Sequence, residues 1–132
     1  LVVVVMTSLS HPEFLKNPDL KDQMNAFLAK MSELQRLEEV RLMNMVINQE
    51  PIEKFIDYIN FNPNSGLAYY YTAGVYWKLN DRDLTESYLR KALLVDNSNS
   101  RFQKTLADLK YAKHGEKIFK TNINFNRAFQ FF

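Results

Sequence analysis

Hydrophobic residues recur along the first half of the chain at the spacing of one helical face. No glycine or proline interrupts residues 19–50. The three- and four-residue steps predict helix across this range. It forms either one helix of about 45 Å, at about 1.5 Å per residue, or two helices that meet at an unmarked joint. The apolar positions are Leu20, Met24, Phe27, Leu28, Met31, Leu34 and Leu37, then less regularly Val40, Leu42, Met43, Val46 and Ile47.

Four shorter helices are predicted after this stretch. Pro51 suits a first helical turn, because its missing N–H would have no partner there. Apolar positions from Ile52 to Ile59 indicate a short amphipathic helix, which the turn-forming run 62–66 ends. The pattern then predicts helices at about 67–79, 84–95 and 101–113. Gly115 is expected to act as a left-handed cap after the last of them.

Both ends of the chain lie outside this helical pattern. We therefore expect an N-terminal tail at 1–18, a helical domain at 19–120 and a C-terminal tail at 121–132. Residues 122–132 alternate between apolar and polar types, which indicates an extended segment or disorder. The six apolar residues at the start are too few to span a bilayer, which needs about 20. They are either a β-like docking tail or the end of something longer, and residues 1–5 could be foreign to the gene.

Two turn sequences lie 34 residues apart, and each follows a short helix. They are Asn62-Pro63-Asn64 and Asp96-Asn97-Ser98, and Ile59 and Leu93 precede them at matching places. Paired helices with this period resemble the tetratricopeptide repeat family. The resemblance implies an all-α fold in which antiparallel helix pairs stack as a short right-handed superhelix. A generic helical bundle without true repeats stays open as the alternative.

Residues 66–99 carry the resemblance as one complete repeat. Its family positions hold Tyr69, Ala73, Tyr76 and Asn80-Asp81, then Thr85, Leu89, Ala92 with Leu93, and Asp96-Asn97. Thr85 replaces the usual alanine, and Asn97 replaces proline. The flanking repeats are degenerate. Glu38-Glu39 stands where a small pair is expected, and the last partner helix would be short, at about Glu116–Phe119.

In the resembled family, one face of the first helix of each pair lines a concave groove that holds a peptide or a partner helix. Tyr69 and Tyr76 are expected in the core. The groove would consist of Arg36, Met43, Tyr70, Trp77, Lys78, Arg101, Lys104 and Tyr111. Aromatic and basic residues suit such a surface. The alternative is that tails or neighbouring segments cover these residues. Tyr70 and Gly74 stand where some members carry a carboxylate clamp, so the resemblance does not support that clamp.

The sequence gives catalysis little support. It has no cysteine, which excludes disulfides, zinc-thiolate sites and thiol nucleophiles. His11 and His114 are far apart and are expected to be solvated. The chain has no glycine-rich phosphate loop and no HExxH motif. We interpret Glu38-Glu39 as a solvated helix face and Asp81 and Asp83 as parts of a turn. No metal, no cofactor and no enzymatic activity are therefore expected.

Charge and composition favour a protein partner. The formal net charge of +2 is too small to imply nucleic acid or an acidic membrane. We expect a non-catalytic helical-repeat scaffold that binds a protein segment or belongs to a larger assembly. The alternatives are a chaperone-like protein that shields a partner segment, and a subunit associated with nucleic acid through surface lysines and arginines. The absence of cysteine favours an intracellular, reducing compartment.

Overall fold

A computed structural model describes residues 18–123, which form five α-helices and no strand. This confirms the predicted all-α class. Of the expected tails at 1–18 and 121–132, residues 1–17 and 124–132 lie outside the described residues. The helices are α3 (Pro18–Ile47), α4 (Ile52–Phe61), α5 (Gly66–Lys78), α6 (Arg82–Val95) and α7 (Ser100–Tyr111). Their ends lie within a few residues of the predicted ones.

Helix α3 crosses the boundary between two compact units, Leu1–Leu37 and Glu38–Phe132. It is one uninterrupted helix of 30 residues, so the first of the two sequence alternatives is confirmed. Within the first unit, Leu20, Leu34 and Leu37 are about half exposed, at 45%, 52% and 48%. Arg36 pairs there with Glu33 one turn earlier, at 2.8 Å.

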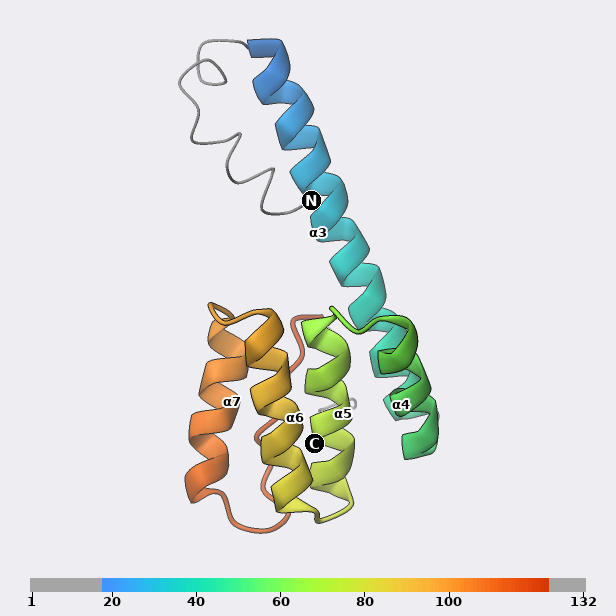
Figure 1. The fold of residues 1–132 in the computed structure, drawn as a ribbon, viewed down its shortest axis with the longest axis vertical. Helices are drawn as coiled ribbons and strands as arrows, with labels where there is room; N and C mark the ends of the chain where they lie inside the picture. The colour runs from blue at the N-terminus through green and yellow to red at the C-terminus, as the bar shows by residue number, and fades with distance from the viewer. Residues whose placement is uncertain (1–17, 124–132) are drawn as a thin grey trace. The chain divides into compact units, whose positions relative to one another are not determined.

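In the second unit, successive helices run antiparallel from the end of α3 through α7 (Figure 1). Helix α5 lies between α4 and α6, and it packs most extensively against α6. The predicted antiparallel pair is therefore present. A helix that is apolar on all sides is stable only when other elements surround it. Helix α5 fits this rule, because its residues Tyr70–Val75 are all buried.

Polar side chains begin three of these helices by accepting the free backbone N–H groups of the first turn. Ser65 accepts from Ala68 N, Asp81 from Leu84 N and Asn99 from Phe102 N, each at 3.1 Å. The caps of α5 and α7, at Ser65 and Asn99, lie 34 residues apart, as do the last residues of α4 and α6. The period predicted from the turn sequences is thus present in the helix boundaries.

After α7 the chain departs from the prediction. The helix ends at Tyr111 with Ala112 as its cap, and Arg82 of α6 donates to the carbonyl oxygens of Leu109 and Ala112. Gly115 has the expected positive φ of 85°, but it lies in a turn beyond the helix. The predicted helix Glu116–Phe119 is wrong, because residues 116–121 are non-helical. They pass behind α6 in the view of Figure 1 and bury Ile118 and Phe119 instead.

Candidate functional site

The candidate site is the surface that holds residues 116–123, which we call the C-terminal segment. Helices α3, α5 and α7 supply the polar and aromatic side chains of this surface. We define the segment groove as Glu39 of α3, Tyr70, Tyr71 and Trp77 of α5, and Arg101 and Thr105 of α7. Helices α3, α5 and α7 therefore face the segment together.

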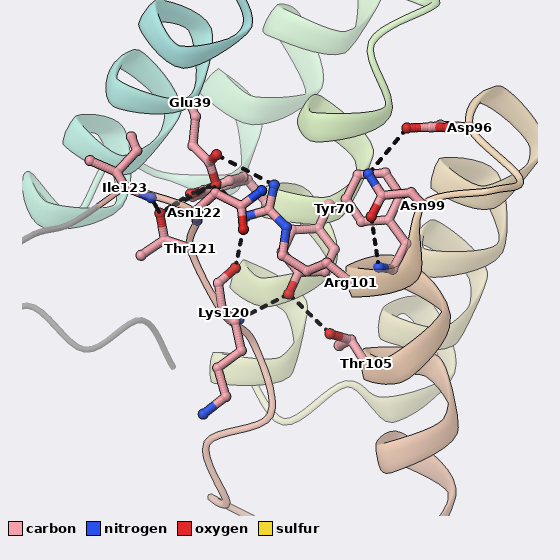
Figure 2. Close-up of polar contacts among 12 residues, drawn as sticks. Glu39, Tyr70, Asp96, Asn99, Arg101, Thr105, Lys120, Thr121, Asn122 and Ile123 are labelled. Carbon is pink, nitrogen blue, oxygen red and sulfur yellow. Dashed lines mark hydrogen bonds and ion pairs between the residues drawn. The ribbon is translucent and has the colours of Figure 1, made fainter. Parts of the chain in front are cut away.

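Side chains of the groove bind the main chain of the segment at every second residue. Trp77 Nε1 donates to the Glu116 carbonyl oxygen at 2.7 Å, and the Thr105 hydroxyl donates to the Ile118 carbonyl oxygen at 3.4 Å. The Lys120 N–H donates to the Tyr70 hydroxyl at 2.9 Å, while Arg101 Nη1 donates to the Lys120 carbonyl oxygen at 3.1 Å (Figure 2). The Asn122 N–H donates to the Glu39 carboxylate at 3.3 Å. This alternation is the period of an extended chain.

Two adjacent apolar side chains anchor the segment. Ile118 is 6% exposed and Phe119 is 1% exposed. The Phe119 ring lies 5.1 Å from that of Tyr70, which in turn stacks on Phe102 at 4.8 Å. Burying two such side chains contributes about 1.5–3 kcal/mol each. The segment is thus part of the hydrophobic core as well as a ligand of the groove.

Glu39 is the polar centre of the groove. Its carboxylate accepts from the Tyr71 hydroxyl at 2.7 Å, pairs with the Arg101 guanidinium, and accepts from the Thr121 hydroxyl at 3.3 Å. The side chain is only 5% exposed. The expectation of a solvated helix face is therefore wrong for Glu39. A signal for its burial was present in the sequence, because Glu39, Leu42 and Met43 follow the spacing of one helical face.

Burial raises the pKa of the Tyr70 and Tyr71 hydroxyls above their ordinary value. For Tyr71 the Glu39 carboxylate adds to this effect, because a phenolate beside it would be repelled. For Tyr70 the hydrogen bond from Lys120 and the nearby Arg101 act in the opposite direction and reduce the rise in pKa. Both phenols consequently stay neutral near pH 7. In that state they act as hydrogen-bonding groups for the segment.

Three of the predicted groove residues meet at the segment, and a fourth lies beside it. Tyr70, Trp77 and Arg101 contact the segment directly, so the chain's own residues cover this face of α5. Lys104 is exposed and lines an open pocket of about 280 Å³ together with Asp108 and Lys120. This pocket runs along the α7 side of the segment.

The other four predicted groove residues lie elsewhere. Met43 is 1% exposed and belongs to the core. Lys78 lines a separate pocket of about 340 Å³ formed by the end of α3, α4 and α5. Tyr111 is 80% exposed at the end of α7. Arg36 belongs to the first unit, where it pairs with Glu33.

The burial of the α5 aromatic residues also differs from the prediction. Tyr69 and Tyr76, expected in the core, are only partly buried and pack on Tyr88, with ring centroids at 6.4 Å and 5.2 Å. Tyr70 and Trp77 are more deeply buried, at 0% and 5% exposed. The C-terminal segment contributes to the burial of Tyr70 and Trp77, because it contacts both side chains.

Sequence reasoning missed Thr105 and Thr121 altogether. Thr105 shares a hydrogen bond with Tyr70 at 3.0 Å, and the Thr121 hydroxyl lies within 3.3 Å of both Tyr71 and Glu39. A single threonine in a helix or a tail carries no distinctive spacing. Their roles follow from contacts between positions 13 to 82 residues apart.

Comparisons with family models, with curated proteins and with solved structures find no match to this chain. Within residues 18–123, no helix is both long and apolar enough to cross a membrane. The same residues contain no cluster of three or more histidine, aspartate or glutamate side chains that could hold a metal ion. Residues 18–123 thus form an all-helical arrangement of five helices.

Proposed function

We propose that the chain is a non-catalytic helical-repeat scaffold, built like a tetratricopeptide superhelix, that binds a protein partner alone or within a larger assembly. The segment groove holds extended polypeptide. One observation carries this proposal: side chains of three helices bind the main chain of residues 116, 118, 120 and 122. Main-chain groups are common to every protein, so the same side chains suit a segment from another chain.

The partners of four arginines among the described residues favour protein over nucleic acid as the partner. Arg36, Arg90 and Arg101 each pair with a glutamate. Arg82 donates to two backbone carbonyl oxygens at the end of α7. Guanidinium groups that already have carboxylate or carbonyl partners are less available for phosphates. This observation supports the protein-binding proposal against the nucleic-acid alternative.

A chaperone-like role is the second candidate. Hydrogen bonds to the main chain tolerate many sequences, whereas the buried pair Ile118 and Phe119 selects apolar side chains. A groove with these two properties suits exposed apolar stretches of incompletely folded proteins. A chaperone would bind many unrelated segments, while a scaffold would bind one or a few.

Site-specific photo-crosslinking tests the proposed function. The photoreactive amino acid p-benzoylphenylalanine replaces Lys104, which is exposed beside the segment groove, or Arg90, which is exposed on α6 and lines the pocket between α6 and α7. After irradiation in the cells of origin, adducts are purified and their peptides sequenced. We expect polypeptide adducts from position 104 and few from position 90. Adducts formed only from position 90, or from neither position, would refute a protein-binding groove at this site.

A further inference from the structure

The C-terminal segment carries a recognition pattern as well as main-chain contacts. Ile118 and Phe119 are buried side by side, and the Thr121 hydroxyl is 3.3 Å from the Glu39 carboxylate and 3.2 Å from the Tyr71 hydroxyl. Lys117 and Lys120 are exposed. The groove therefore buries two adjacent apolar side chains, leaves the next side chain exposed, and contacts the hydroxyl of the residue after it.

The pattern is specific because each position meets a different kind of surface. Phe119 lies against the Tyr70 ring, where a smaller side chain would leave a void. The Thr121 hydroxyl interacts with a buried carboxylate, and removing it would leave the Glu39 oxygen with one donor fewer. Lys120 contributes its N–H and carbonyl oxygen, which any residue except proline supplies.

A short exposed turn connects this segment to α7. Lys113, His114, Gly115 and Glu116 are all exposed, and a Cβ atom at Gly115 would meet nothing within 4 Å. This turn acts as a tether. A tether this short holds the segment near its groove at an effective concentration on the order of millimolar. An outside segment must compete against that concentration. The turn thus makes the segment a built-in competitor for its own groove.

We propose that the segment groove recognises extended partner segments of the form apolar–apolar–any–threonine or serine, and that residues 116–123 occupy it as an intramolecular competitor until such a segment displaces them. This inference rests on the proposed function and specifies its partner. Binding is then regulated by competition. A partner gains access when it matches the pattern and is presented at high local concentration, or when the tether is released.

Cutting the tether after folding tests this proposal on the complete chain. A protease recognition sequence is inserted into the exposed turn at 113–115, the full chain is folded, and the turn is then cleaved. A fluorescent peptide with the sequence of residues 116–123 is added, and its uptake is followed by anisotropy. We expect uptake by the cut chain at a concentration at least tenfold lower than by the uncut chain, because cleavage removes the tether's advantage.

Three peptide variants test the pattern. The Phe119→Ala peptide should bind at least tenfold more weakly than the original. The Thr121→Val peptide should bind severalfold more weakly. Lys120→Ala is the matched control and should bind like the original, because it keeps the main chain. Equal uptake of all variants would overturn the pattern but leave the polypeptide-binding groove in place. No uptake by the cut chain, or unfolding of its helices when the fragment leaves, would overturn both this proposal and the extended-polypeptide groove.

Discussion

At the scale of single residues, the buried pair of Glu39 and Arg101 dominates the energetics of the groove. Both side chains are nearly buried, at 5% and 12% exposed. Removing charges from water costs several kcal/mol per ion unless partners replace the lost hydration. Glu39 has four hydrogen-bonding partners, but Arg101 Nε has none among the described residues. The carboxylate is thus better satisfied than the guanidinium.

Removal of Glu39 alone should therefore be costly. Glu39→Ala leaves the Arg101 guanidinium buried without its counter-charge, and we expect a loss of about 3–5 kcal/mol in the free energy of unfolding. Urea unfolding followed by circular dichroism measures it. Glu33→Ala is the control, since its pair with Arg36 is exposed and its loss should change stability little. Similar stability of both variants would show that Glu39 does not hold a buried charge pair.

At the scale of elements, local signals explain which predictions succeeded. Pro51 at the start of α4, the turn residues at 62–66 and 96–99, and the apolar steps between them fix helix ends through contacts within a few residues. The 34-residue period was readable for the same reason. The helix expected at Glu116–Phe119 was wrong. The repeat pattern calls for a partner helix there, whereas contacts with α5 and α7 determine the conformation of this stretch.

The cap of α7 tests one such local signal. Asn99 accepts the Phe102 N–H and donates to the Asp96 side chain at 3.1 Å. Asn99→Ala should lower the free energy of unfolding by about 1 kcal/mol, since it leaves a helical N–H without a side-chain acceptor. Thermal and urea unfolding measure the change. Asn97→Ala, at an exposed turn position, is the matched control and should leave stability nearly unchanged. Equal effects of the two substitutions would contradict the capping role.

The contact between α3 and α4 predicts a response to alkaline pH. The Tyr58 hydroxyl donates to Glu38 at 3.0 Å, and burial together with that carboxylate raises the pKa of Tyr58 to about 12 from an ordinary 10. The unfolded chain therefore loses this proton before the folded one does. The stabilisation is complete below pH 10 and is lost as the pH rises from 10 toward 12.

The urea midpoint of the wild type should accordingly fall more steeply between pH 10 and 12 than that of Tyr58→Phe, which has no phenol to ionise. Near pH 8 the variant should be less stable by about 1 kcal/mol, because it lacks one hydrogen bond. The difference in phenolate absorbance near 295 nm between the wild type and Tyr58→Phe would report the ionisation of Tyr58, since the other six tyrosines are common to both proteins. Parallel pH profiles for the two proteins would contradict the raised pKa.

At the scale of the whole molecule, the groove is a product of tertiary contacts that no sequence pattern contains. Tyr70 and Lys120 meet across 50 residues, and Glu39 and Asn122 across 83. The resemblance to the repeat family implied that Tyr70, Trp77 and Arg101 share one surface. It left open whether a tail or a partner covers that surface, since the burial of Ile118 and Phe119 depends on three separate helices. The structure shows the chain's own segment in this place.

Trp77 offers a direct probe of this arrangement, because it is the only tryptophan of the chain and its indole donates to Glu116. Phe119→Ala should weaken the segment by about 3–5 kcal/mol, the usual cost of removing a buried aromatic ring. If the segment opens as a local unit, Trp77 emission shifts to longer wavelength at urea concentrations where helical circular dichroism persists. His114→Ala, in the exposed turn, should keep both transitions at wild-type positions. If the emission shift and the loss of helicity in Phe119→Ala occur at the same urea concentrations, the segment and the helices form one cooperative unit. A groove that cannot open separately would not accept a competing chain.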